Sequence, residues 1–213
     1  MAEVQLVEPV VRFCGIISRH ADAHQWAIDL ISAQWGSPVL QSPPIPFEAG
    51  GYYRASMGDE LLKTLVAFEG FHDPGGLADW KLATNQWEAD YASISPHADA
   101  RPINLDPGYT SQAKLVLATT KDRDHRIYLR NGIFAEVTLT YVHKKWEHHR
   151  WSYPTYRGVE VAKFAQQCRE NLRAHLKDAK QFRHRETGPV PTQKRLELEA
   201  ARRKDQEKKT PKA

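Results

Sequence analysis

The sequence has little cysteine and no long apolar run. Its 213 residues include two cysteines, Cys14 in an apolar strand-like segment and Cys168 on the apolar face of a predicted helix. Both are typical of small buried hydrophobic residues rather than of a disulfide or a nucleophile. No run approaches the ~20 apolar residues that span a bilayer, and the N-terminus lacks the pattern of a signal peptide. We therefore expect a cytoplasmic protein that does not contact membranes.

Several well-known functional motifs are also missing. The sequence has no Gly-x-x-x-x-Gly-Lys-Ser/Thr loop for a nucleotide, no aromatic RNA-binding strand motif and no paired His-x-Thr/Ser motif. His20 and His24 lie four residues apart and His148 and His149 are adjacent, but neither pair has a matching carboxylate or cysteine pattern. We predict no metal site, and the sequence indicates no particular cofactor.

The basic character of the chain is confined to its C-terminal end. Residues 1–182 carry 20 Lys/Arg against 21 Asp/Glu, a net charge of −1, whereas residues 183–213 carry 10 against 5, a net charge of +5. A basic tail is weaker evidence for nucleic-acid binding than a basic folded surface. We expect a single domain over residues 1–182 and a disordered tail over residues 183–213 that can make weak contacts with nucleic acid.

The pattern of apolar residues in the first half predicts alternating strands and helices. Strands are expected at Val10–Ser18, Pro38–Phe47, Leu61–Phe71 and from Ile103, with one helix between Asp22 and Gly36 and another over Leu77–Tyr91. The order strand, helix, strand, strand, helix, strand is that of a ferredoxin-like βαββαβ unit.

The second half adds a hairpin and a helix. Strands are predicted at Lys114–Thr120, Arg126–Arg130 and Ile133–Tyr141, and Asn131-Gly132 is a strong signal for a tight hairpin turn. A helix over Val159–Lys180 has an apolar face that should dock on the domain. The predicted fold class is α+β: a mainly antiparallel sheet with helices on one face and a C-terminal hairpin extension.

Four motifs in the central region carry a resemblance to a known family. They are NLDPGY at 104–109, KLVLATTK at 114–121, HRIYL at 125–129 and AEVTL at 135–139. With these motifs the sequence resembles an uncharacterised bacterial family, domain of unknown function 4416, over roughly residues 8–176. The resemblance implies a fold shared with that family and no particular activity.

The segment from Asn104 to Tyr109 is a candidate site. Asp106-Pro107-Gly108 is typical of a turn, since Asp accepts backbone N–H bonds, Pro fixes φ and Gly tolerates positive φ. That structural role alone can account for these three residues. Asn104 and Tyr109 are not needed for a turn, and Asp106 is a candidate for a base, a metal ligand or a ligand contact.

A second group of polar residues lies between two predicted strands. Hydroxyl, ammonium, guanidinium and imidazole groups of this kind suit a phosphate or carboxylate. The group consists of Thr119, Thr120, Lys121, His125, Arg126 and Tyr128. The alternative is a charged connection with local ion pairs, because Asp122 and Asp124 lie in the same turn.

The predicted helix over Leu77–Tyr91 carries a polar stripe. Lys81, Thr84, Asn85 and Glu88 lie three or four residues apart and share one flank. A solvated Lys81–Glu88 face would explain the two charged residues. Thr84 and Asn85 are poor helix formers and favour a polar pocket instead.

Together these groups predict a polar pocket for a small anionic, phosphorylated ligand or nucleotide. Asp106 and His125 are the catalytic candidates, although the sequence does not decide whether the protein is an enzyme, and it leaves the oligomeric state open. The candidate ligand-binding residues are Lys81, Thr84, Asn85, Asn104, Tyr109, Lys114, Thr119, Thr120, Lys121, Arg126 and Tyr128. The alternative is a non-enzymatic interaction module that contacts RNA or a protein partner through its charged hairpin and basic tail.

Overall fold

A computed structural model describes residues 7–48, 51 and 53–180. The expected disordered tail, residues 183–213, lies outside these residues. The helices are α1 (Ala21–Trp35), α2 (Arg54–Met57), α3 (Leu77–Ile94) and α4 (Val159–Asp178), and short 3-10 turns cover Pro74–Gly76 and Pro154–Tyr156. The strands are β1 (Val11–Ser18), β2 (Pro38–Gln41), β3 (Ile45–Pro46), β4 (Leu62–Phe68), β5 (Asn104–Thr110), β6 (Lys114–Thr119), β7 (Arg126–Arg130), β8 (Ile133–Val142) and β9 (Lys145–His148). The mixed α+β class is confirmed.

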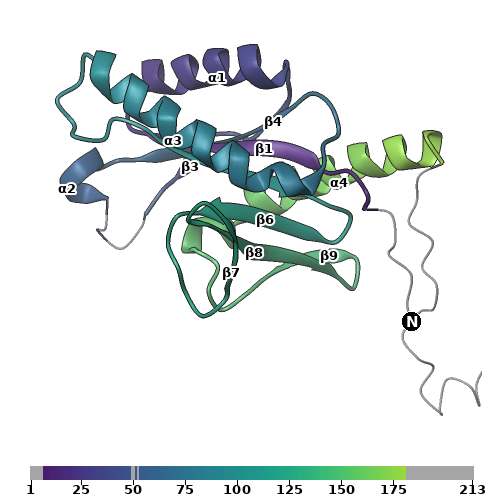
Figure 1. The fold of residues 1–213 in the computed structure, drawn as a ribbon. Helices are drawn as coiled ribbons and strands as arrows, with labels where there is room; N and C mark the ends of the chain where they lie inside the picture. Colours follow the sequence, from purple (N-terminus) through teal and green to yellow (C-terminus); the bar gives the residue numbers. More distant parts are fainter. Residues whose placement is uncertain (1–6, 49–50, 52, 181–213) are drawn as a thin grey trace, which may run out of the picture. The chain divides into compact units, whose positions relative to one another are not determined.

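One antiparallel sheet holds all nine of these strands (Figure 1). Its main path is β2-β4-β1-β5-β6-β8-β7, with β3 beside β4 and β9 beside β8. Along the chain, β1, α1, β2, β4, α3 and β5 follow one another in the order expected for the ferredoxin-like unit, with β3 and α2 inserted between β2 and β4. The proline-rich segment forms the short strands β2 and β3, and β2 ends the sheet, where missing N–H donors are tolerated.

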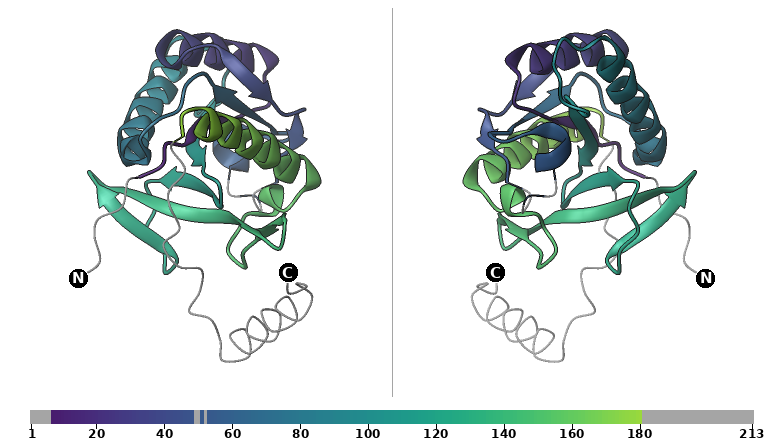
Figure 2. Two further views of the ribbon diagram at one scale, coloured as in Figure 1. Left: turned by 90° about the vertical axis from the view of Figure 1, so that its right-hand side faces the viewer. Right: turned by 90° about the vertical axis from the view of Figure 1, so that its left-hand side faces the viewer.

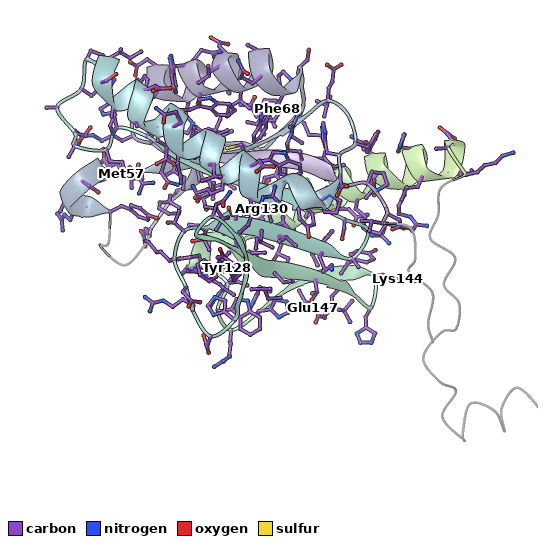
Figure 3. The ribbon with its side chains drawn as sticks, viewed as in Figure 1. Met57, Phe68, Tyr128, Arg130, Lys144 and Glu147 are labelled. Carbon is purple, nitrogen blue, oxygen red and sulfur yellow. The ribbon has the colours of Figure 1, made fainter. Side chains whose placement is uncertain are left out.

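The helices cover both faces of the sheet, so the prediction of helices on one face is wrong. Cys14, Ile16 and Phe68 pack with residues of α1 and α3, and Figure 3 shows Phe68 beneath these helices. Phe13 and Leu65 point to the other face, where they pack with α4. Because side chains alternate along a strand, β1 and β4 are buried on both faces, and Figure 2 shows α4 on the side away from α1 and α3.

The second half of the sheet is built from hairpins. Asn131 and Gly132 have φ of 52° and 76° and join β7 to β8, as predicted. The structure adds β9, which the sequence analysis missed. Its turn is formed by His143 and Lys144, with φ of 49° and 67°. The pair is not the Asn-Gly or Asp-Gly typical of such turns, so the turn gave no strong local signal.

The Asp106-Pro107-Gly108 segment is strand rather than turn, which corrects the prediction. Its residues pair with β1, Asp106 opposite Gly15 and Gly108 opposite Phe13. Gly108 is required by packing, because a Cβ there would lie 2.4 Å from the Val116 carbonyl oxygen. Pairing with β6 begins only at Gly108↔Leu117. The first half of β5 is therefore not paired with the end of β6.

The start of α1 also differs from the prediction. His20, not Asp22, is the N-cap residue, and it makes no side-chain capping bond. Asp22 lies within the first turn, and its carboxylate contacts His97 instead. Gly36 ends the helix with φ of 94°, as its position predicted.

Candidate functional site

A cavity lies where the first half of β5 and the end of β6 are not paired. Its volume is about 110 Å³, and α3, β4 and the turns after β6 and before α4 complete its walls. The lining residues are Phe47, Tyr53, Lys63, Lys81, Asn85, Arg101, Asn104, Asp106, Leu117, Ala118, Thr119, Thr120, Lys121, Arg126, Glu136, Tyr153 and Tyr156. The unpaired segment of β5 therefore leaves a polar opening in the sheet between β5 and β6.

The polar stripe of α3 forms one wall. Lys81 is buried, and its Nζ donates to the Leu105 carbonyl oxygen at 2.6 Å. The same Nζ lies 3.6 Å from Glu88 Oε1 and 3.9 Å from Asp106 Oδ1. The stripe thus faces the start of β5, and the interpretation of Lys81 and Glu88 as a solvated face is wrong.

Glu88 links this wall to Arg101. Its Oε2 accepts from Arg101 Nη2 at 2.6 Å, and its Oε1 accepts from the Leu105 backbone N–H at 2.8 Å. Arg101 also donates to Asn104 Oδ1. Burial acts to lower the pKa of Arg101, but the neighbouring carboxylate of Glu88 raises it above its ordinary value. One carboxylate therefore balances two cations, Lys81 and Arg101.

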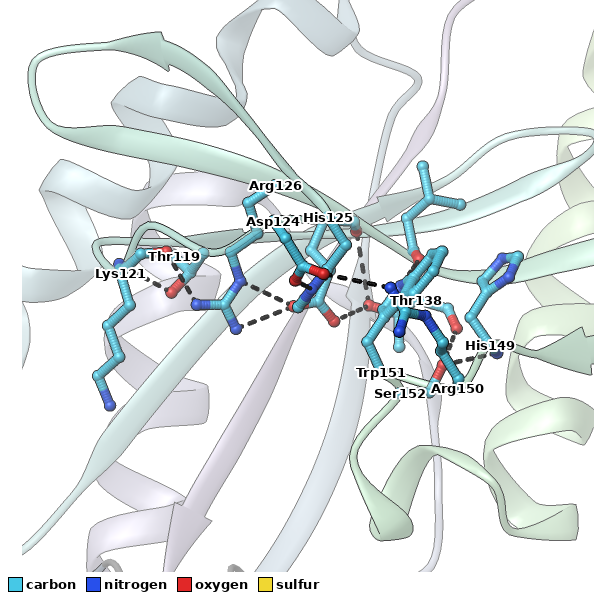
Figure 4. A network of polar contacts seen from close by, with 12 residues as sticks. Thr119, Lys121, Asp124, His125, Arg126, Thr138, His149, Arg150, Trp151 and Ser152 are labelled. Carbon is cyan, nitrogen blue, oxygen red and sulfur yellow. Dashed lines mark hydrogen bonds and ion pairs between the residues drawn. The ribbon is translucent and has the colours of Figure 1, made fainter.

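The turn between β6 and β7 forms a second charged group (Figure 4). Arg126 Nε and Nη2 each lie 2.9 Å from Glu136 Oε2, and Arg126 Nη1 donates to the Lys121 carbonyl oxygen at 2.8 Å. His125 Nε2 lies 3.1 Å from the same carboxylate oxygen, and its ring stacks on Trp151. In Figure 4 the Lys121 side chain extends away from these contacts. Within the turn, Asp124 Oδ1 lies 3.0 Å from His125 Nδ1, which is a local contact of the kind predicted, whereas Arg126 pairs with Glu136 of β8. Arg126 and Lys121 both line the cavity.

The opposite wall is aromatic and holds a second buried lysine. Lys63 lies on β4 with 1% of its surface exposed. Its Nζ is 3.8 Å from the centre of the Tyr156 ring, 4.6 Å from that of Phe47 and 3.3 Å from the Thr155 hydroxyl. Burial lowers the pKa of Lys63 from 10.5 to about 7, although the charge of Asp106 acts in the opposite direction. Near neutral pH this amine is therefore present in both its charged and its neutral form.

Two polar atoms of the lining lack hydrogen-bond partners within the described residues. They are Asn104 Nδ2 and the Tyr156 hydroxyl, and both residues are buried. Burial raises the pKa of Tyr156 well above its ordinary value, so its hydroxyl keeps its proton. Both groups are donors, and buried donors are normally satisfied. The cavity therefore offers two hydrogen bonds to an acceptor.

The structure brings most of the sequence-predicted site residues around this cavity. The predicted residues that line it are Lys81, Asn85, Asn104, Asp106, Thr119, Thr120, Lys121 and Arg126. They come from α3, β5, β6 and the turn before β7. Segments separated by more than 40 residues thus contribute to one cavity.

The other five predicted residues lie elsewhere. Thr84 is buried and bonds the Lys81 carbonyl oxygen, and Tyr109 packs among apolar residues of α3 and β8. Lys114 is exposed at the far end of β6, and Tyr128 is 59% exposed on β7. His125 contacts Glu136 without lining the cavity.

Several lining residues were not predicted from the sequence, notably Tyr53, Lys63, Arg101, Glu136 and Tyr156. Lys63 did leave a signal, because it lies within the apolar strand predicted over Leu61–Phe71, where the other charged residue, Glu69, is near the end. Lysine is almost never fully buried unless its charge is paired, so a lysine within an apolar strand needs a structural or functional explanation. Tyr53, Arg101 and Tyr156 lie outside the four motifs, and Glu136 lies within AEVTL, where it was not considered as a site residue.

The fold and the cavity define an α+β protein with a cation-rich cavity at a gap in its sheet. The chain belongs to the family called Domain of unknown function (DUF4416), whose model matches residues 8–172. No curated protein and no solved structure matches the chain. None of the described helices has both the length and the apolar character needed to cross a membrane.

Proposed function

We propose that this protein binds a small anionic, phosphorylated ligand in the cavity, in the cytoplasm. The observation that carries the proposal is the charge of the lining. Five cationic side chains, Lys63, Lys81, Arg101, Lys121 and Arg126, line it together with two carboxylates, Asp106 and Glu136. Counting Glu88, which lies directly behind the wall, the cations still exceed the carboxylates by two when Lys63 is protonated.

The unsatisfied donors support the same ligand class. A phosphate oxygen has lone pairs for both Asn104 Nδ2 and the Tyr156 hydroxyl. Thr119 and Thr120 add hydroxyl donors at the end of β6. The volume of about 110 Å³ is below the ~300–1,000 Å³ of pockets for drug-sized molecules, which favours a small ligand or the anionic end of a larger one.

Asp106 and His125 have different places in this proposal. Asp106 lines the cavity about a quarter exposed and lies 3.9 Å from Lys81, so it can accept a ligand hydroxyl or act as a base toward it. His125 contacts the Glu136 carboxylate, which in turn pairs with Arg126, so His125 helps to position Arg126. We assign no reaction to the site.

Two lysines on the same strand and its following turn provide a matched test. Lys121→Ala removes a charge from the cavity, and Lys114→Ala removes one from the exposed far end of β6. Thermal-shift screening against sugar phosphates and nucleotides, followed by calorimetry, should find ligands that the Lys114→Ala variant binds like wild type. Lys121→Ala should lose about 1–3 kcal/mol of binding free energy. No stabilising anion for wild type, or equal binding by all three proteins, would contradict the proposal.

Arg126→Ala is a less informative test. Arg126 is paired with Glu136, which is 3% exposed. Removing the guanidinium takes the main cationic partner from a buried carboxylate, and breaking a buried pair typically costs about 3–5 kcal/mol of folding free energy. A change in ligand binding by this variant would therefore reflect both the lost positive charge in the cavity and the lost stability of the fold.

The alternative function, an interaction module for RNA or a protein partner, rests on the charged hairpin and the basic tail. It requires positive charge spread over an open surface. The cations described above converge on a concave site instead. Titration of labelled RNA with the full-length chain and with a chain ending at Lys180, at two salt concentrations, tests the alternative. Undiminished, salt-sensitive RNA binding by the shorter chain would favour it.

A further inference from the structure

Three metal-ligating side chains meet at the start of α1, outside the cavity. They are His20, just before the helix, Asp22 in its first turn, and His97 in the loop that follows α3. One possible ligand atom from each residue lies within 4.8 Å of those of the other two. The fold thus supplies a partner to His20 and Asp22 that lies 75 residues away along the chain.

The contacts within this cluster are short. His97 Nε2 lies 3.0 and 2.9 Å from the two carboxylate oxygens of Asp22. The rings of His20 and His97 are stacked, with centroids 3.5 Å apart and planes inclined by 2°. The three side chains therefore lie together. Because an imidazole binds a metal ion in the plane of its ring, the His97 ring must turn out of this stack for both histidines to reach one ion.

A further carboxylate lies on the other side of His20. Asp99 Oδ2 is 2.6 Å from His20 Nε2, and Asp99 Oδ1 is 3.0 Å from Arg19 Nη2. Arg19 balances the charge of Asp99, so Asp99 serves to orient His20. Carboxylates that orient an imidazole in this way are common around metal sites.

From this geometry we infer that His20, Asp22 and His97 bind a divalent transition-metal ion of the Zn²⁺ class. Two imidazoles and one carboxylate are typical zinc ligands, and a solvent molecule can take the fourth position. Ligand atoms bound to one tetrahedral zinc ion lie roughly 3.4 Å apart, so no separation within the cluster has to close by more than about 1.4 Å. Asp22 and His97 are partly exposed and can make this adjustment by side-chain rotation.

The stack of His20 and His97 brings two imidazoles together beside the Asp22 carboxylate. A bound metal ion takes neutral imidazoles and supplies the positive charge that faces Asp22. The metal ion would also link the start of α1 to the loop after α3.

Zinc and cobalt titrations of the metal-stripped, full-length protein test this inference. Wild type should bind one Zn²⁺ at this site by calorimetry, gain thermal stability from it, and give the visible absorption of four-coordinate Co²⁺. His97→Ala and Asp22→Ala should each weaken this binding at least tenfold. His97→Gln should do the same while keeping a polar side chain of similar reach, which guards against an effect of misfolding.

The matched control is His143→Ala, which removes an exposed histidine from the β8–β9 turn. It should leave the metal affinity and the cobalt spectrum unchanged. The inference is wrong if wild type binds neither ion, or if Zn²⁺ affinity is the same in wild type, His97→Ala, His97→Gln and Asp22→Ala.

Discussion

The two buried lysines of the cavity lie in opposite surroundings. On the α3 wall, Lys81 donates to a backbone carbonyl and lies near Glu88 and Asp106. On the aromatic wall, Lys63 faces the rings of Phe47 and Tyr156 and the hydroxyl of Thr155. One wall therefore holds its cation by ion pairs, and the other holds an amine whose charge is costly to bury.

This difference suggests that the two walls contribute to ligand binding in different ways. Lys81 and Arg101 share Glu88, so much of their charge is already balanced within the protein. Lys63, with a pKa of about 7, gains most from an anion that enters the cavity. We therefore expect a bound anion to have its largest effect on the aromatic wall, where it favours the charged form of Lys63.

The largest effect should come from breaking the α3 wall. Glu88→Gln keeps the size of the side chain and an acceptor for the Leu105 N–H, but leaves two cations without their shared carboxylate. We expect unfolding free energy to fall by about 3 kcal/mol, at the lower end of values for broken buried pairs because Arg101 is partly exposed. Urea unfolding measures this, with Glu147→Gln, a change at a partly exposed side chain of β9, as control. Equal stability of both variants would show that the wall does not depend on Glu88.

A smaller effect, of opposite sign, should follow from Lys63→Met. The folded-state pKa of about 7 lies below the unfolded value of 10.5, so between these values the unfolded chain binds more protons. Wild-type stability should therefore rise from pH 7 to pH 9.5, with about 2–3 kcal/mol due to Lys63. Below about pH 7 this contribution stays constant.

The measurement is the difference in unfolding free energy between Lys63→Met and wild type across that pH range, which cancels the other titrating groups. Lys63→Met should be the more stable protein at pH 7, and its advantage should shrink as pH rises. A difference that does not vary with pH would show that Lys63 titrates normally.

Part of this arrangement could be predicted from the sequence. Asn131-Gly132 fixes the β7–β8 turn through local backbone preferences, and the polar residues at the end of β6 marked one side of the cavity. Lys121 and Asp106 were assigned to one polar pocket from their residue types, and both line the cavity.

The rest depended on tertiary contacts. Asp106-Pro107-Gly108 has the local preferences of a turn, but pairing with β1 over seven residues keeps it extended. Arg101 reaches the cavity from the loop before β5 and Tyr156 from the 3-10 turn before α4, with no shared motif. The depth of Lys63 follows from covering β4 on both faces, which the prediction of helices on one face did not include.

The smallest effect should come from Tyr156→Phe. The hydroxyl has no partner within the described residues, so its removal loses no hydrogen bond and should change unfolding free energy by less than about 1 kcal/mol. The same change should weaken binding of a phosphorylated ligand, because a donor to the ligand is lost. Chemical unfolding and calorimetry of this variant separate the two effects. A large loss of stability would mean that the hydroxyl is satisfied in the folded protein.

Crystals soaked in tungstate, which has the charge and shape of a phosphate dianion, would show directly whether the cavity binds an oxyanion. We expect an anomalous tungsten peak inside the cavity, within contact distance of Lys63, Lys81 or Lys121 and of the Tyr156 hydroxyl. Tungstate found only on the outer surface, with the cavity filled by water, would contradict it.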